Sequence, residues 1–198
     1  EERLQALKEV GCYRISFGLE HGNEQYRKEK LQRNISNKRI LERAAIVAKV
    51  GIPYTINTLI GMPYETRDLF FETVDFIRAI RTWDALSVNI FVPYRGTVLR
   101  QMALKEGWLD PAAQTTSVIA RSILDMPKGY LQPDEILILQ HVVSLYATFD
   151  KARWPEIAEI EATWHTESGQ ERFRKMSKEW SIKKYGIREE DRMLSYQG

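Results

Sequence analysis

The stretch PYTINTLIG, residues 53–61, is short and rich in β-branched and aromatic side chains, which is typical of a β-strand. It ends at Gly61, and Pro63, which cannot extend a hydrogen-bonded ladder, follows at once. Apolar residues recur at helical spacing before it, over residues 37–50, and after it, over residues 67–80. A strand enclosed by two amphipathic helices predicts an α/β fold.

The same alternation extends in both directions from this strand. A helical pattern over residues 1–10 leads through Gly11 into a predicted strand over residues 13–20, and the helix at 67–80 leads into one over residues 86–94. Ser36 is a natural N-cap for the helix at 37–50. Three successive units of this kind predict a parallel sheet with helices on its outside.

From about residue 98 the pattern is helical only. We expect one domain over residues 1–105 and a helical C-terminal region over residues 106–198. The helices expected there cover residues 98–108, a segment that follows Pro111, and residues 131–154.

Composition excludes several classes of protein. With 43% hydrophobic and 28% charged residues, the chain is neither disordered nor fibrous. A net charge of +2 gives no case for nucleic acid or an acidic membrane as partner, and no apolar run approaches the roughly 18 residues of a membrane span. Cys12 is the one cysteine, so no intrachain disulfide can form, and a reducing, cytoplasmic setting is expected.

The N-terminus suggests that the chain is a piece of a longer protein. The first residue is Glu, and residues 1–10 read as the middle of a helix with no N-terminal turn or cap before it. A trimmed natural start is the alternative.

Ligands of parallel α/β sheets bind at the carboxyl ends of the strands. The first strand ends in a segment where Glu20 lies between two glycines and Arg33 follows. Glu20 can accept hydrogen bonds from hydroxyl or ammonium groups, and Arg33 can bind a carboxylate in bidentate fashion. The alternative is a solvated Glu20 and a surface ion pair for Arg33, and His21 is expected to be an ordinary loop residue.

The other two strand ends are less charged. Gly61 would let a ligand approach the backbone, and Asn57 and Leu59 are expected on the same side of the strand. Glu65 either caps the next helix or positions a ligand. For Thr66, capping of that helix is the only role expected. The third strand ends in an apolar run that suits either a flat heterocycle or the core.

Three segments together resemble the later half of a radical S-adenosylmethionine (radical SAM) enzyme. They are ALKEVGCYRISFGLEHGNEQYRKEKLQR (6–33), AKVGIPYTINTLIGMPYET (48–66) and IFVPYRGTVL (90–99), in the order and spacing of that family. The resemblance covers roughly residues 5–105 and is strongest to the branch with an N-terminal cobalamin-binding domain.

The resemblance implies a fold and a set of SAM contacts. The three strands would be the fourth to sixth of a partial (β/α)6 barrel. Glu20 would contact the ribose or amino-acid end of SAM, and Arg33 its carboxylate. Asn57, Leu59 and Gly61 match the fifth-strand motif, with Asn57 in place of its first glycine. The residues expected to line the adenine are Val92, Pro93 and Tyr94.

The resemblance also implies cofactors that this chain cannot hold alone. The family binds a [4Fe–4S] cluster through a CxxxCxxC loop, so its ligands, like the cobalamin domain, would lie outside this chain. The chain alone is then expected to be inactive, without catalytic or metal-binding residues of its own. Its expected partners are the missing N-terminal portion of the enzyme and a small-molecule substrate, with no nucleic acid and no membrane.

Two other functions remain open on the residues alone. One is a non-enzymatic half-barrel that binds a nucleotide or a partner chain. The other is an unrelated α/β-barrel enzyme, for which Glu20 and His21 form the only candidate acid–base pair. The reaction and the substrate are not specified by any motif.

Overall fold

The computed structural model of the chain describes residues 1–115 and 120–186. It divides into two compact units, residues 1–140 and 141–198, which are described separately. The domain boundary predicted after residue 105 stays a prediction.

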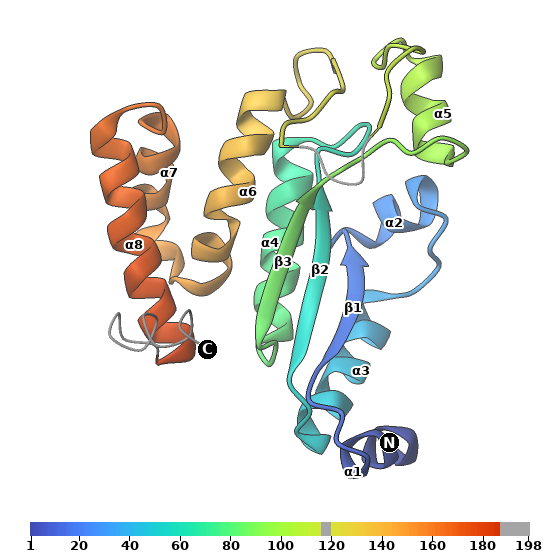
Figure 1. Cartoon of the computed structure of the whole chain (residues 1–198), viewed down its shortest axis with the longest axis vertical. Coiled ribbons are helices and arrows are strands. Elements are labelled where there is room, and N and C mark those ends of the chain that lie inside the picture. The colour runs from blue at the N-terminus through green and yellow to red at the C-terminus, as the bar shows by residue number, and fades with distance from the viewer. Residues whose placement is uncertain (116–119, 187–198) are drawn as a thin grey trace. The chain divides into compact units, whose positions relative to one another are not determined.

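The first unit is an open parallel sheet of three strands in the order β1-β2-β3, with helices between them (Figure 1). The predicted α/β fold, with its parallel units and C-terminal helices, is therefore confirmed. The elements are α1 (Glu2–Glu9), β1 (Ile15–Glu20), α2 (Glu24–Lys30), α3 (Asn37–Val50), β2 (Tyr54–Ile60), α4 (Arg67–Ile80), β3 (Ala85–Ile90), α5 (Val98–Lys105) and the first part of α6 (Pro133–Thr148), which continues into the second unit.

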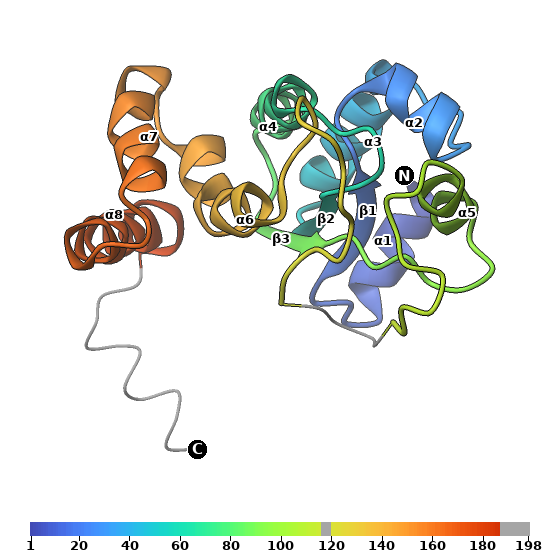
Figure 2. The same cartoon turned by 90° about the horizontal axis from the view of Figure 1, so that it is seen from above.

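One face of the sheet is covered and the other is partly open. Figure 2 shows α3 and α4 together on one face of the sheet. Burial alternates strictly along β2, because successive side chains of a strand point to opposite faces. Tyr54, Ile56 and Ile60 are buried, whereas Asn57 and Leu59 lie on the half-buried face, as the sequence predicts.

The helices next to β2 begin where capping residues predict. Ser36 accepts a hydrogen bond from the backbone N–H of Arg39 at the start of α3, and Thr66 accepts one from Leu69 at the start of α4. The α3 helix ends at Gly51 in the left-handed conformation that a C-terminal glycine adopts readily. Both helices have the predicted bounds.

The outer strands are shorter than predicted. The first begins at Ile15 rather than at residue 13, and Tyr13 is 83% exposed. The third ends at Ile90 rather than at residue 94. Pro93 has no N–H to donate, and the chain turns so that the N–H of Tyr94 donates to the carbonyl of Val92.

The segment after α5 is not the helix predicted to follow Pro111. No helix is found over residues 111–115 or 120–124, and the rest of that prediction lies outside the described residues. The Arg100 side chain donates to the carbonyls of Pro111 and Ala113, and these bonds tie the segment to α5. Leu124 and Met126 are buried in the cluster that contains Phe91.

The second unit is helical throughout its described part. It contains the end of α6, a 3-10 turn at Lys151–Arg153, α7 (Trp154–Ala162) and α8 (Glu167–Tyr185). The predicted helix over residues 131–154 is therefore interrupted after Thr148, and Pro155 stands in the first turn of α7. Across the described residues, no helix combines the length and apolarity that a membrane crossing requires.

Candidate functional site

The three strands end at one edge of the sheet, and each is followed by a loop held by a buried charged side chain. Arg27 holds the loop after β1, Glu65 the turn after β2, and Arg100 the loop after β3. All three are at most 5% exposed. This edge therefore has a fixed backbone on which more exposed side chains can form a site.

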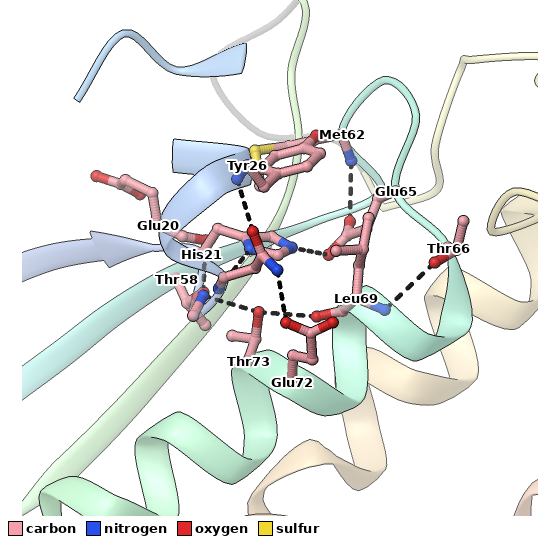
Figure 3. A network of polar contacts seen from close by, with 12 residues as sticks. Glu20, His21, Tyr26, Thr58, Met62, Glu65, Thr66, Leu69, Glu72 and Thr73 are labelled. Carbon is pink, nitrogen blue, oxygen red and sulfur yellow. Dashed lines mark hydrogen bonds and ion pairs between the residues drawn. The ribbon is translucent and has the colours of Figure 1, made fainter. Parts of the chain in front are cut away.

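Glu20 ends β1 in an unusual backbone conformation. Its φ is 64°, in the left-handed region that costs a residue with a side chain about 1–3 kcal/mol. The pairing of β1 with β2 is irregular between Gly18 and Glu20, and the Thr58 hydroxyl donates to the Glu20 carbonyl at 2.7 Å. In Figure 3 the Glu20 carboxylate points away from the polar contacts behind it.

Glu20 and Arg33 lie together beside a hollow of about 340 Å³. The Nη1 atom of Arg33 lies 3.4 Å from Glu20 Oε1 and donates a hydrogen bond to the Gly18 carbonyl at 3.0 Å. The hollow is lined by Glu20, Lys30, Leu31, Gln32, Arg33, Leu59, Thr97, Val98 and Leu99. It thus combines both charges with apolar walls, in the volume range of small-molecule sites.

Burial raises the pKa of Glu20, and the Arg33 guanidinium opposes that shift. A carboxyl group that is harder to ionise when folded destabilises the protein at neutral pH, in proportion to its ionisation. The protein alone therefore stabilises the Glu20 carboxylate incompletely. A ligand with an ammonium or hydroxyl group could donate to it and stabilise the charged form.

We expect Glu20→Gln to raise the free energy of unfolding at pH 7. Because the pKa of Glu20 is raised on folding, its contribution is most favourable below the ordinary carboxyl range and is lost as the pH rises. The advantage of the variant should shrink as the pH falls to about 4. Urea unfolding of the variant and the wild type at several pH values measures the difference in their free energies of unfolding. A difference that grows in favour of the variant in acid would contradict a raised pKa of Glu20.

Glu65 closes the turn after β2. Its Oε2 accepts hydrogen bonds from the N–H groups of Gly61 at 2.6 Å and Met62 at 3.2 Å, and the residue is 1% exposed. Neither role expected from the sequence is seen: Thr66 caps α4, and buried Glu65 is not open to a ligand. The carboxylate instead satisfies two backbone donors that the strand end leaves unpaired.

Gly61 and Asn57 have neighbours that the sequence did not indicate. Gly61 has φ 81°, and a Cβ built on it would lie 2.7 Å from Ile136 of α6, so a residue with a side chain would not fit here. The predicted approach of a ligand to the Gly61 backbone stays a prediction. Asn57 donates from Nδ2 to the Ser16 hydroxyl at 2.8 Å, across the strand pair. Of the three motif positions on β2, Leu59 is the one that lines the hollow.

Val92, Pro93 and Tyr94 form a loop and not the strand end predicted for them. Pro93 is buried and its carbonyl accepts from Arg100 Nη1 at 2.9 Å, while Tyr94 is 45% exposed. None of the three lines the hollow; the nearby wall comes from the start of α5, residues 97–99. Their predicted contact with adenine stays a prediction.

The loop after β1 contains residues whose roles sequence reasoning missed. His21, expected to be an ordinary loop residue, is fully buried and lies 3.5 Å from Glu65. Gly22 donates to the Thr73 hydroxyl on α4 at 2.9 Å, and Asn23 caps α2. Arg27 of α2 donates to the carbonyls of His21, Gly22 and Ile35 and to the Asn37 side chain.

An iron–sulfur cluster does not fit the residues of this chain. Three thiolates are needed, and Cys12 is the chain's one cysteine. It lies before the amino end of β1, at the opposite end of the strand from Glu20, and is half-buried. The described residues also contain no group of three or more histidine, cysteine or acidic side chains that could hold a metal. The hollow, by contrast, presents a guanidinium, a carboxylate and leucine side chains, which can contact anionic, polar and apolar groups of a small ligand.

Comparisons with known proteins support a relationship over this part of the chain. One curated relative, an uncharacterized methyltransferase of Pyrococcus horikoshii, is 28% identical over 109 residues. That alignment covers 55% of this chain and 23% of the relative, so the chain matches about a quarter of the relative's length. Residues 1–77, which contain β1, β2 and the first part of α4, match the sequence model of the Radical SAM superfamily.

Proposed function

We propose that this chain is part of a radical SAM enzyme and contributes one side of its SAM pocket. The observation that carries the proposal is the convergence of Glu20, Arg33 and Leu59 on one hollow at the carboxyl edge of a parallel sheet. Glu20, Arg33 and Leu59 all lie within the segment that matches the family. SAM, when bound and cleaved in such enzymes, supplies a 5′-deoxyadenosyl radical.

Each part of the hollow has a role in holding SAM. Arg33 presents a planar guanidinium that can bind the carboxylate of the methionine portion. Glu20 accepts from the ammonium group or the ribose hydroxyls, and Leu59 covers an apolar face of the ligand. The ion pair between Glu20 and Arg33, at 3.4 Å, keeps both side chains at the hollow before the ligand arrives.

The remainder of the pocket is proposed to come from the N-terminal portion of the same enzyme. Among the described residues β1 pairs with β2 alone, so it is an edge strand. An apolar groove of about 360 Å³ runs beside it, lined by Ile15 and Phe17 of β1 and by Ile40, Ala44 and Val47 of α3, among others. A further strand and helix would cover both, and the same portion would supply the cluster ligands.

Three finer assignments are part of the proposal. Methyl transfer is supported by the name of the Pyrococcus horikoshii relative, an uncharacterized methyltransferase. Use of cobalamin is supported by the resemblance of the sequence to that branch of the family. A reducing, cytoplasmic location agrees with the single cysteine.

SAM titration of the enzyme that carries this chain tests the proposal. We expect Arg33→Ala to weaken SAM binding about 10- to 150-fold, the loss typical of a hydrogen bond between charged groups. Arg39→Ala, which removes an exposed arginine from α3, is the matched control and should bind like the wild type. Equal affinity of the two variants would refute the assignment of the hollow. Binding of other nucleotides in preference to SAM would favour the non-enzymatic half-barrel.

A further inference from the structure

The buried pair His21–Glu65 connects the loop after β1 to the turn after β2. His21 is completely buried and Glu65 is 1% exposed. His21 Nε2 lies 3.5 Å from Glu65 Oε1, and neither atom has another hydrogen-bond partner in the described part of the chain. Polar atoms buried this deeply normally have partners, so this contact calls for an explanation.

The backbone determines which nitrogen of His21 carries the proton. Nδ1 lies 3.0 Å from the N–H of Asn23 and accepts its hydrogen bond. A backbone N–H cannot accept, so Nδ1 must present its lone pair. The proton of the neutral ring is therefore on Nε2, which faces Glu65 in Figure 3. Because little water screens this place, an N–H and a carboxylate oxygen attract each other across 3.5 Å.

Glu65 is surrounded by donors. Its Oε2 accepts from Gly61 and Met62, and its Oε1 faces the Nε2–H of His21. A carboxylate has only acceptor sites, so three N–H groups directed at it hold it in one orientation. Without the His21 contact, only the two bonds to Oε2 would remain, and the carboxylate could rotate about them.

His21 is itself fixed by its surroundings. Its ring stacks on Tyr26 with centroids 4.2 Å apart, and the Tyr26 hydroxyl donates to the Pro63 carbonyl at 2.7 Å. Burial and the neighbouring Glu65 carboxylate raise the pKa of Tyr26 well above its ordinary value, so this hydroxyl keeps its proton. Two separate contacts, one to Pro63 and one to Glu65, thus join the first loop to the second turn.

We propose that His21 is a positioning residue for the SAM pocket, which acts on ligand binding through Glu65. The inference rests on the proposed function. Glu20, which lines the hollow, is bonded directly to His21, and Gly61 follows Leu59 by two residues. By fixing Glu65, the imidazole fixes the turn that begins at Gly61, and with it the position of Leu59 relative to Glu20. His21 touches neither the hollow nor, on this account, SAM.

A set of matched variants separates positioning from mere packing. His21→Phe keeps a flat ring on Tyr26 but removes the Nε2–H, whereas His21→Gln retains an N–H donor. Glu65→Gln removes the charge on the other side. His141→Phe, at an exposed histidine of the second unit, is the control for the substitution itself.

The first readout is independent of SAM. Amide hydrogen exchange at Gly61 and Met62 reports directly on their bonds to Glu65. We expect exchange to be at least about fivefold faster in His21→Phe, near the wild-type rate in His21→Gln, and unchanged in His141→Phe. Unchanged exchange in a folded His21→Phe protein would overturn the proposal, whatever the protein binds.

The second readout is SAM affinity, measured on the cluster-loaded enzyme well below its unfolding temperature. We expect about a tenfold loss for His21→Phe, the size seen when an outer partner of a binding group is removed, and recovery in His21→Gln. In the double variant with Glu65→Gln the losses should not add, because both act through one contact. A loss of stability with unchanged affinity would overturn the proposal. Absence of SAM binding in the wild type would instead refute the proposed function, and the exchange result would still test the pair.

Discussion

Replacing Arg27 with alanine is expected to lower the free energy of unfolding by about 3–5 kcal/mol. The guanidinium is fully buried and donates to three backbone carbonyls, those of His21, Gly22 and Ile35. Each carbonyl left without a partner in the interior costs about 1–3 kcal/mol. Burial lowers the pKa of Arg27, which reflects the cost of placing a charge there, and the hydrogen bonds offset that cost.

Two further variants give this prediction its controls. Arg27→Lys keeps the charge, but one ammonium group cannot reach carbonyls on both sides of the planar guanidinium, so less than half of the loss should be recovered. Arg39→Ala removes an exposed arginine and should change stability by no more than about 0.5 kcal/mol. Chemical denaturation measures all three, and a loss for Arg27→Ala as small as that of the control would contradict its role.

Gly22→Ala is expected to destabilise the protein by about 3 kcal/mol or more. A Cβ at this position would lie 2.4 Å from the Cα of Thr73 and 2.9 Å from the carbonyl oxygen of Glu72. Both are backbone atoms of α4, so no side chain can rotate away. The loop after β1 would have to move from α4, breaking the hydrogen bond from Gly22 to the Thr73 hydroxyl.

The matched control for this substitution is Gly96→Ala. Gly96 has φ 83°, but a Cβ at this position would have no neighbouring atom within 4 Å, so only the left-handed backbone is penalised, by about 1 kcal/mol. Thermal unfolding of both variants compares them. Equal effects at Gly22 and Gly96 would mean that the loop after β1 does not depend on its close approach to α4.

Local signals predicted the regular elements well. The helices at 37–50 and 67–80 have caps and apolar stripes within their own sequence, so their bounds followed directly. The short helix α2 was missed because it is polar and is packed mainly through Tyr26 and Arg27. The third strand was drawn too long because its apolar composition continues past Ile90, and the bond from Arg100 to Pro93 cannot be read from sequence.

In the candidate site, too, some residues could be predicted from the sequence, whereas others depend on long-range contacts. Glu20, Arg33 and Leu59 were predicted from strand-end positions and the family resemblance, and they line one hollow. The roles of His21 and Glu65 depend on each other, although the two residues are far apart in the sequence. A local sequence pattern cannot predict a contact of this kind. The close approach of Ile136 to Gly61 likewise joins two residues that are far apart in the sequence.

Hydrogen exchange with and without SAM, measured by mass spectrometry on the enzyme that carries this chain, tests the central claim most directly. The account predicts slower exchange on SAM addition in peptides that cover residues 18–33, 57–65 and 92–99, the three strand-end segments. Peptides of α7 and α8 in the second unit should be unchanged. Protection confined to the second unit, or none at these strand ends in a protein that binds SAM, would contradict the assignment of this edge as part of the SAM pocket.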